Sequence, residues 1–274
     1  MNINLKGKLI PLETPIVMGI VNFTEDSFYD GGCYFDEQRL RKRVATLVKE
    51  GVDIIDLGAI STRPGAKDLD EVSEIERVKK ALQLIVSEFP NVPVSIDTWR
   101  SSVAEMAIGE GAAMINDISG GTFDEKMIPL IGKMKVPYCL MHTTAKPELM
   151  QQCTEYTDIL SDIIQYFERQ ITQLKDAGAN DIILDPGFGF GKTLEQNYFI
   201  LENLHVFSVF NLPLLVGVSR KSMIYKLLDT TPQEALNGTT VLNTIAIQKG
   251  ARILRVHDVK EAKETIRIIQ TLKQ

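Results

Sequence analysis

The sequence predicts a single domain over residues 1–274 that folds as a closed (β/α)₈ TIM barrel with a short N-terminal β-hairpin. Eight short segments rich in Ile, Val and Leu have the composition of strands that are buried on both faces. Longer amphipathic segments with helical periodicity separate them. The ends of successive strands lie about 34 residues apart on average, which suits βα units. No linker interrupts the series, and an open doubly wound sheet is the alternative fold.

Predicted strands and helices alternate along the whole chain. The predicted strands are Ile16–Asn22, Val52–Leu57, Val92–Asp97, Met114–Ile118, Tyr138–His142, Ile182–Asp185, Leu214–Ser219 and Arg252–His257. The clearest predicted helices are Asp36–Glu50, Val72–Phe89, Tyr156–Ala177, Pro232–Lys249 and Val259–Leu272. Before the first strand, Asn2–Pro11 alternates in character around a Lys-Gly-Lys turn, and we expect a hairpin that closes the bottom of the barrel.

Capping residues support these boundaries. A glycine just past a helix adopts the left-handed conformation at little cost, so a helix that ends in glycine before an apolar run predicts a helix-to-strand connection. Thr231-Pro232 places an N-cap residue and a first-position proline at the start of a helix. The glycines expected to end helices are Gly51, Gly111, Gly178 and Gly250.

Composition excludes several classes of protein. The formal net charge of −6 argues against binding to nucleic acid or to an anionic membrane surface. No apolar run approaches the roughly 20 residues of a membrane span, and residues 1–13 contain no apolar region typical of a signal peptide. Cys33, Cys139 and Cys153 form no CxxC pair, and we expect small, mostly buried thiols in a reducing compartment. We therefore expect a cytoplasmic protein.

Polar residues stand at the ends of several predicted strands. Taken singly, Asn22 and Asn116 could be turn residues, Asp97 could cap the next helix, and Asp185 could be held extended by the proline after it. In a barrel, however, all of these ends lie on one face around one pocket. Carboxylates and amides there suit a heterocycle that carries amino and ring N–H donors. The amide of Asn22 could alternatively supply an oxygen ligand for Mg²⁺.

Basic residues form a second set near the same face. Arg255 and His257 flank one residue of the last strand, so the period of two along a strand points both side chains to the same side. A planar guanidinium beside an imidazole is a good clamp for phosphate, and the loop residue Arg63 could complete it. We expect these cations to lie at the rim of the pocket and the loops 24–35 and 61–70 to act as lids.

Two further segments follow strand ends. Ser219 is expected to cap a helix whose first turn holds Arg220 and Lys221, where the helix dipole disfavours cations unless they meet a polar or anionic ligand. Residues 186–193, PGFGFGKT, are similar to a phosphate-binding loop but have proline where that motif needs its first glycine. We expect its glycines to let the backbone approach a flat ligand, with Phe190 as an aromatic wall.

Taken together and in order, these motifs resemble the dihydropteroate synthase family over essentially the whole chain. Each run is weak alone, but the set is specific. The matching runs are residues 19–28 (GIVNFTEDSF), 61–65 (STRPG), 95–98 (SIDT), 115–120 (INDISG), 141–142 (MH), 185–192 (DPGFGFGK), 217–222 (GVSRKS) and 255–259 (RVHDV). The resemblance implies a barrel, usually a homodimer, that condenses 6-hydroxymethyl-7,8-dihydropterin diphosphate with 4-aminobenzoate. The products would be 7,8-dihydropteroate and diphosphate, in folate biosynthesis, with Mg²⁺ assisting.

The resemblance also implies a role for each matched residue. The pterin would be held by Asp97, Asn116, Asp185 and Lys221, with Met141 as an apolar wall. The diphosphate would be held by Asn22, Arg63, Arg255 and His257, with Asn22 on Mg²⁺. The aminobenzoate site would be shaped by Phe28, Thr62, Pro64, Phe190, Lys221 and Ser222. Catalysis would depend on Lys221, Arg63, Asp97 and Asp185.

Three places depart from the family pattern. Glu25 stands where the family usually has proline, Ala59 and Ile60 stand where glycine and glutamate are common, and the run after His142 lacks the usual glycine. These changes fall in loops, while the pterin residues are intact. They leave a catalytically silent pterin-binding paralogue as one alternative. A corrinoid methyltransferase that uses methyltetrahydrofolate is another, although it should not need the STRPG and SRKS runs.

Overall fold

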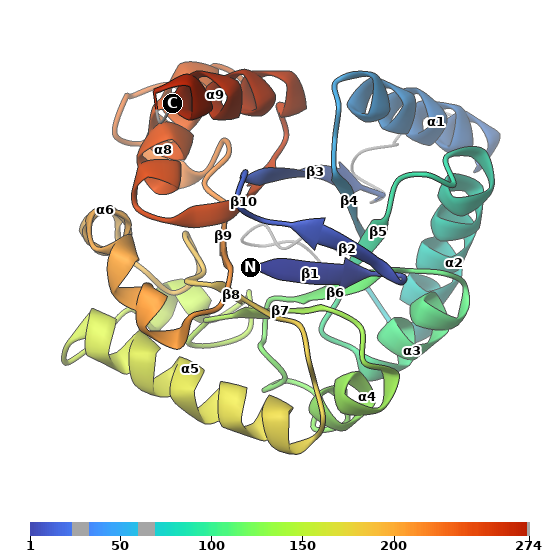
Figure 1. Ribbon diagram of the computed structural model, residues 1–274, viewed down its shortest axis with the longest axis horizontal. Helices are drawn as coiled ribbons and strands as arrows, with labels where there is room; N and C mark the ends of the chain where they lie inside the picture. Colours follow the sequence, from blue (N-terminus) through green and yellow to red (C-terminus); the bar gives the residue numbers. More distant parts are fainter. Residues whose placement is uncertain (24–32, 60–68, 273–274) are drawn as a thin grey trace.

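The computed structural model describes residues 1–23, 33–59 and 69–272. Within these residues, parallel strands close into a barrel in the order β10-β3-β4-β5-β6-β7-β8-β9 (Figure 1), so the first and last barrel strands pair with each other. This closure confirms the (β/α)₈ barrel and rules out the open sheet. The barrel strands are β3 (Ile16–Asn22), β4 (Ile54–Gly58), β5 (Val94–Asp97), β6 (Met114–Asp117), β7 (Tyr138–Met141), β8 (Ile182–Asp185), β9 (Leu214–Val216) and β10 (Ala251–Val256).

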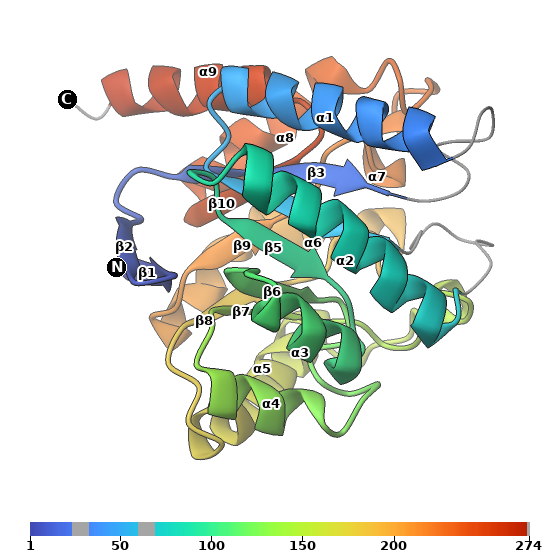
Figure 2. The same cartoon turned by 90° about the vertical axis from the view of Figure 1, so that its right-hand side faces the viewer.

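Helices surround the barrel on its outside (Figures 1 and 2). No described helix is both long enough and apolar enough to span a membrane. The helices are α1 (Cys33–Lys49), α2 (Glu71–Glu88), α3 (Ser101–Gly109), α4 (Met127–Met134), α5 (Ile159–Asp176), α6 (Leu194–Glu202), α7 (Ser222–Tyr225), α8 (Leu236–Gln248) and α9 (Val259–Thr271), with 3₁₀ turns η2 (Met150–Gln152) and η3 (Leu204–Phe210). The shorter helices α3, α4, α6 and α7 were not among the clear sequence patterns, because one to three turns give little periodicity to detect.

Two predicted helix starts were too early, for local reasons. α5 begins three residues after Tyr156, because the side chain of Asp158 accepts hydrogen bonds from two backbone N–H groups of the first turn. α8 begins four residues after Pro232, since residues 232–235 form a separate turn. In that turn the carboxylate of Glu234 accepts from the backbone and the hydroxyl of Thr231. The capping signal at Thr231 was therefore real but belonged to the turn.

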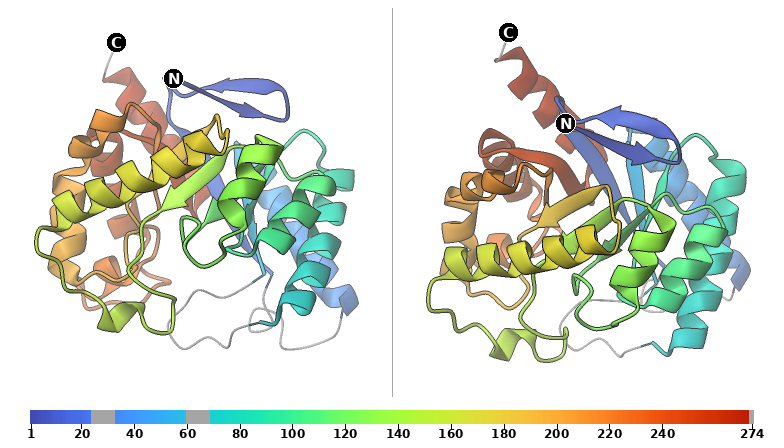
Figure 3. Two further views of the ribbon diagram at one scale, coloured as in Figure 1. Left: turned by 90° about the horizontal axis from the view of Figure 1, so that it is seen from below. Right: turned by 60° about the horizontal axis from the view of Figure 1, so that its bottom comes forward.

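The N-terminal hairpin closes one end of the barrel, as the sequence predicted (Figure 3). Its strands β1 (Asn2–Leu5) and β2 (Lys8–Pro11) pair antiparallel around Lys6-Gly7, both in the left-handed conformation. Ile3 and Leu5 are buried against the inward-facing side chains at the amino ends of the barrel strands. The polar strand ends are therefore left at the opposite end. The side chains that the hairpin covers are Ile16, Met18, Ile54, Met114, Cys139, Ile183, Leu215 and Ile253.

Glycines that end helices have the conformation predicted for them. The φ values are 84° at Gly51, 104° at Gly111, 98° at Gly178 and 110° at Gly250. A different constraint acts on Gly132 in α4, where an added Cβ would lie 2.0 Å from the backbone oxygen of Ala177. α4 and α5 therefore pack at a distance that only glycine permits.

We predict that Gly132→Ala lowers the free energy of unfolding by roughly 2 kcal/mol or more, because a rigid backbone atom occupies the space for the new methyl group. Urea denaturation measures the effect. Gly109→Ala is the matched control: an added Cβ there meets nothing within 4 Å, so it should stabilise α3 by about 0.5–1 kcal/mol. Equal effects of the two substitutions would contradict this account.

Candidate active site

Polar side chains from the carboxyl ends of the barrel strands line a deep pocket. Three strands supply its acceptors, with Asp97 on β5, Asn116 on β6 and Asp185 on β8. All three side chains are largely or fully buried. The pocket lining comprises Asp97, Asn116, Ile118, Met141, Asp185, Phe190, Gly217, Lys221 and Arg255. The barrel therefore brings together most of the described residues that the sequence analysis assigned to the site.

Arg255 lies in this deep pocket, paired with two carboxylates. Its Nε donates to Oδ2 of Asp56 at 2.6 Å, and one Nη donates to Oδ2 of Asp97 at 2.7 Å. The expectation that Arg255 would stand at the rim beside His257 is therefore wrong. Strand alternation correctly turned its side chain inward, but the buried carboxylates hold the guanidinium deep in the lumen.

Asp56 was missed as a site residue, although it is the second-last residue of the predicted strand Val52–Leu57. It is fully buried at the middle of β4 and does not line the pocket itself. One oxygen accepts from both Arg255 and the amide of Asn116, the latter at 3.0 Å. The other oxygen has no hydrogen-bond partner among the described residues. Asp56 thus orients two pocket side chains, and a carboxylate near the end of an otherwise apolar predicted strand was the signal that could have identified it.

Burial shifts the ionisation of the deep groups. Burial raises the pKa of Asp97 to about 7. The positive charge of Arg255 lowers this pKa, and the negative charge of Asp56 raises it further. The pKa of Asp185 is raised by burial as well, while Lys221 and the backbone N–H of Gly187 oppose the rise. Burial disfavours the charge of Arg255, but Asp56 and Asp97 raise its pKa above the usual range. The pocket thus buries carboxylates and cations whose ionisation states depend on one another.

Lys221 closes one side of the pocket. Its ammonium donates to the backbone oxygen of Phe188 and lies 4.6 Å from the ring centroid of Phe190, a cation–π distance. Burial lowers its pKa to about 8, while the charge of Asp185 acts in the opposite direction. Ser222 follows at the start of α7 and is half-buried. Lys221 thus links the carboxylates of the barrel with an aromatic wall.

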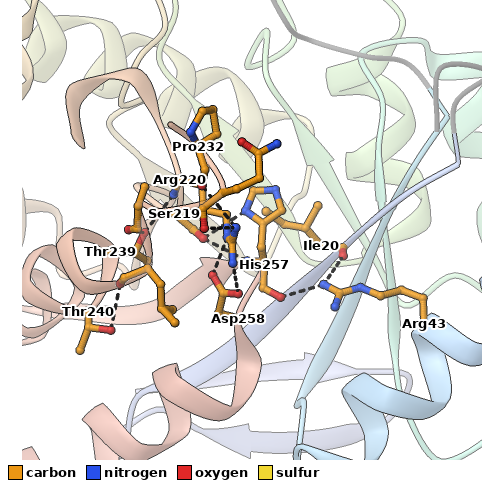
Figure 4. A network of polar contacts seen from close by, with 12 residues as sticks. Ile20, Arg43, Ser219, Arg220, Pro232, Thr239, Thr240, His257 and Asp258 are labelled. Atoms are coloured by element: carbon orange, nitrogen blue, oxygen red, sulfur yellow. Dashed lines mark hydrogen bonds and ion pairs between the residues drawn. The ribbon is translucent and has the colours of Figure 1, made fainter. Parts of the chain in front are cut away.

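Ser219 and Arg220 do not form the helix start that the sequence predicted. α7 begins only at Ser222, with Lys221 in the preceding capping position, and Arg220 is left-handed with φ 55°. The guanidinium of Arg220 forms a two-point ion pair with Asp258 at 2.9 and 2.7 Å (Figure 4). The expected clash of two cations with the helix dipole therefore does not arise for Arg220. Its charge is used to hold the segment after β10.

His257 is fixed from several sides in the same network. Its backbone N–H donates to the hydroxyl of Ser219 at 3.1 Å, and its Nδ1 lies 3.1 Å from that hydroxyl. Arg43 of α1 donates to the backbone oxygens of His257 at 2.8 Å and Ile20 at 3.2 Å (Figure 4). Arg43 therefore ties α1 to both strands of the barrel seam. Nothing in the sequence around Arg43 indicated this contact, because its partners are backbone atoms of distant segments.

His257 lines a second, outer pocket of about 410 Å³. Burial, followed by the charge of Arg255, lowers the pKa of His257 to about 4, so the ring is neutral at neutral pH. Asn22, at the exposed end of β3, lines the same pocket. The lining comprises Ile20, Val21, Asn22, Arg39, Leu40, Arg43, Arg220, His257 and Asp258. The outer pocket is therefore basic through arginines that the sequence analysis did not assign to it.

Several expected site residues lie outside the described residues. These are Phe28, Thr62, Arg63 and Pro64, together with the divergent loop positions Glu25 and Ile60. Ala59 is described, and it is buried beside the end of β4. Among the described residues, no group of three His, Cys, Asp or Glu side chains is arranged to hold a metal ion.

Comparison with known proteins agrees with this geometry. The sequence profile of a family described as "Pterin binding enzyme" matches residues 18–257. The dihydropteroate synthase of Escherichia coli K12 is 40% identical over 272 residues, covering 98% of this chain and 96% of the relative. That of Clostridium beijerinckii is 44% identical over 252 residues, covering 91% of each.

Solved structures give the same result. Yersinia pestis dihydropteroate synthase in a sulfonamide drug complex superposes with a TM-score of 0.93 at 38% identity, covering 100% of this chain and 99% of that one. The Xanthomonas albilineans enzyme with 4-aminobenzoic acid superposes with a TM-score of 0.92 at 31% identity, covering 99% and 98%.

We predict that Asp56→Ala destabilises the fold by about 3–5 kcal/mol, because it removes one partner of a buried ion pair. Thermal and urea unfolding measure the loss. Glu88→Ala breaks an ion pair with Arg41 whose side chains are each 39% exposed, and it should leave the unfolding midpoint nearly unchanged. A small effect of Asp56→Ala would show that Arg255 does not depend on this carboxylate.

Proposed function

The chain belongs to the family of pterin binding enzymes and is a transferase of the dihydropteroate synthase kind, and we propose that it joins a dihydropterin to 4-aminobenzoate. The pterin substrate is 6-hydroxymethyl-7,8-dihydropterin diphosphate, and the products are 7,8-dihydropteroate and diphosphate. The observation that carries the proposal is the convergence of Asp97, Asn116 and Asp185 in one buried pocket beside Lys221. Carboxylate and amide oxygens there match the amino and ring N–H donors of a pterin.

The deep carboxylates have a second role once the pterin is bound. The bond between the methylene carbon and the diphosphate oxygen breaks, and the electron pair leaves with diphosphate. Positive charge then develops on the methylene and spreads into the pterin ring, where Asp97 and Asp185 favour it electrostatically. The amine of 4-aminobenzoate forms the new carbon–nitrogen bond and loses a proton. No protein nucleophile is needed.

Lys221 and Phe190 are placed to shape the approach of the second substrate. Both line the deep pocket, and the ammonium of Lys221 lies against the Phe190 ring. The positive charge of Lys221 suits the carboxylate of aminobenzoate, and the ring of Phe190 suits its aromatic face. Burial of both side chains helps to exclude water, which would otherwise trap the developing cation.

Diphosphate is proposed to occupy the outer pocket. Asn22 and His257 line it with Arg43 and Arg220, so it offers arginine side chains to phosphate oxygens. His257 stands two residues after Arg255 of the deep pocket, at the end of β10, so the two pockets lie at the same end of the barrel. His257 is neutral and can donate one hydrogen bond to phosphate oxygen. Arg63 remains a predicted further ligand in a loop that lies outside the described residues.

Mg²⁺ is proposed as the accompanying ion. The donor set fits it only in part from the protein, because Asn22 supplies a neutral oxygen in a pocket otherwise rich in arginine. Mg²⁺ usually keeps several waters and binds through substrate phosphates, so a single amide ligand is compatible with an ion that arrives with diphosphate. When bound, the ion would neutralise charge on the leaving diphosphate. Asn22 would orient that ion, and the arginines would hold the remaining phosphate charge.

A second copy of the chain is proposed as a partner in solution. α6, α7 and α8 contact one another, and large apolar side chains on and beside them are about half exposed. These are Phe199, Leu227, Leu228 and Val241. Light scattering should give twice the 30.6 kDa mass of the chain. Val241→Asp should shift the protein toward monomer, whereas Ile268→Asp on the exposed face of α9 should not. A monomeric wild-type protein would exclude the dimer.

A cytoplasmic location remains part of the proposal. The free thiols of buried Cys139 and exposed Cys153 fit a compartment that keeps cysteines reduced. Cell fractionation with a periplasmic marker tests the location, and recovery with the periplasmic fraction would contradict it.

We predict that the wild-type protein releases diphosphate only when both substrates are present, in a coupled assay. Lys221→Ala should lower kcat/KM by about 100-fold or more, because the ammonium acts inside a buried pocket. Lys226→Ala, an exposed lysine five residues along the chain, is the control and should retain full activity.

A pterin-binding measurement and a methyl-transfer assay, run beside the diphosphate assay, separate the alternatives. Pterin binding without turnover would identify a silent paralogue. Methyl transfer from methyltetrahydrofolate to a corrinoid would identify the methyltransferase.

A further inference from the structure

The glycine-rich segment after β8 has a defined structure that differs from a phosphate-binding loop. Gly187, Gly189 and Gly191 all have positive φ, at 73°, 81° and 60°. An added Cβ on Gly187 would lie 2.0 Å from the backbone oxygen of His142, the residue after β7. The loop therefore packs directly against the neighbouring strand end, and its peptide groups turn back on the chain.

Lys192, which occupies the lysine position of the failed phosphate-binding motif, points into this loop. Its side chain is 4% exposed. The ammonium donates to the backbone oxygens of Phe190 at 2.9 Å and Gly187 at 3.0 Å. It also lies 3.1 Å from Nδ1 of His142 and 3.4 Å from the backbone oxygen of that residue. Lys192 thus binds the carbonyl groups of its own loop where a phosphate-binding lysine would bind a ligand.

The ring of His142 is kept neutral beside the ammonium of Lys192. Burial, followed by the charge of Lys192, lowers the pKa of His142 well below its usual value. When Lys192 is protonated it can only donate, so Nδ1 of the neutral ring then accepts and the ring proton is on Nε2. Burial lowers the pKa of Lys192 to about 7, while Asp185 opposes this shift. A lysine that makes no ion pair among the described residues is costly to bury, and three backbone carbonyls compensate for the lost water.

Two other side chains form hydrogen bonds with the backbone of this loop. The hydroxyl of Tyr156 donates to the backbone oxygen of Gly191 at 2.8 Å. The amide oxygen of Asn197 accepts from the backbone N–H of Gly189 at 2.7 Å. The carbonyl of Phe188, which lies between the first two glycines, accepts from Lys221. Both contacts of Lys221, the Phe188 oxygen and the Phe190 ring, therefore belong to the loop that Lys192 organises.

We propose that Lys192 is a positioning residue for the condensation. Its buried ammonium donates hydrogen bonds to the backbone oxygens of residues 187 and 190 and of His142 after β7. These bonds fix the loop, and the loop in turn sets the positions at which Lys221 and the Phe190 ring contact the aminobenzoate. This role rests on the proposed synthase function. Lys192 touches neither substrate.

The effect of Lys192 passes through the loop, so it should act more strongly on the second substrate than on the pterin. Two of the proposed pterin ligands, Asp97 and Asn116, lie on other strands, whereas Asp185 accepts from the backbone N–H of Gly187 in the loop. Because Asp185 and Lys221 adjoin the loop, a smaller loss of pterin affinity is expected as well.

The test compares Lys192→Met with Lys175→Met. Methionine keeps the length of the side chain and removes the charge and the donors, and Lys175 is an exposed lysine of α5. Lys192→Met should lower kcat/KM for 4-aminobenzoate about tenfold or more, because displacement of a substrate-contacting group by about 1 Å can cost about 100-fold. Its Kd for bare 6-hydroxymethylpterin should change by no more than about threefold. Lys175→Met should match wild type in both measurements.

A second measurement does not depend on activity. Trp99 is the single tryptophan of the chain, and it belongs to the apolar cluster that contains Phe190 and Met141. Acrylamide quenching of its fluorescence should therefore change in Lys192→Met and remain unchanged in Lys175→Met. If the wild-type protein shows no turnover, the proposed function fails, while the quenching result still decides whether Lys192 positions the loop.

Clear outcomes would overturn the proposal. Wild-type kcat/KM together with wild-type quenching in Lys192→Met would show that the loop does not need the ammonium. An equal loss of pterin affinity and of kcat/KM would show a general structural role instead. Should Lys192→Met fail to fold, Lys192→Gln carries the same test, because its amide is neutral and still donates to carbonyls. That variant should show the same selective loss to a smaller degree, and full activity in it would exclude any need for the charge.

Discussion

The ion pairs of Arg255 with Asp56 and Asp97 are the interaction on which the rest of the site depends. A guanidinium buried in a barrel lumen is tolerable only when carboxylates surround it, and two strands across the seam provide them. Asp56 at the same time holds the amide of Asn116. The polar groups of the deep pocket are thus oriented before any ligand binds.

The separation of two pockets follows from this pairing. Since Arg255 is held deep by its carboxylates, the arginines that line the outer pocket are Arg39, Arg43 and Arg220. Arg220 is itself neutralised by Asp258, and Arg43 is bound to backbone oxygens of the barrel seam. A substrate with a flat polar ring at one end and two phosphates at the other matches such a division. The reacting methylene would lie between the two pockets.

Two lysines, Lys192 and Lys221, follow glycine-containing segments but bind different partners. Lys221 lines the pocket, and within the described part of the chain its ammonium donates to one backbone oxygen, that of Phe188. The ammonium of Lys192 donates to backbone carbonyls of its own loop, so its hydrogen bonds are made within the protein. The two buried lysines thus differ: Lys221 lines the pocket, and Lys192 binds the backbone of the loop that Lys221 contacts.

Local information in the sequence was sufficient for the barrel and for the ring of polar strand ends. Apolar strand composition and glycine helix caps act over a few residues, so the strand order and the positions of Asp97, Asn116 and Asp185 could be predicted. Helices without periodicity, such as α7, could not be placed, and the assignment of Ser219 as a cap failed because its hydroxyl is bound to His257 instead. Local patterns could not reveal which side chains pair with one another across the fold.

Only the tertiary structure decided which groups pair. Arg255 meets carboxylates 199 and 158 residues away, and Lys192 meets the ring of a histidine 50 residues earlier. The sequence by itself determined that polar and basic groups would gather at the carboxyl ends of the strands. Closure of the barrel determined that Arg255 would lie deep, that His257 would be neutral, and that Lys192 would bind its own loop. The physical reason is that burial and charge pairing arise only when distant segments remove water from one another.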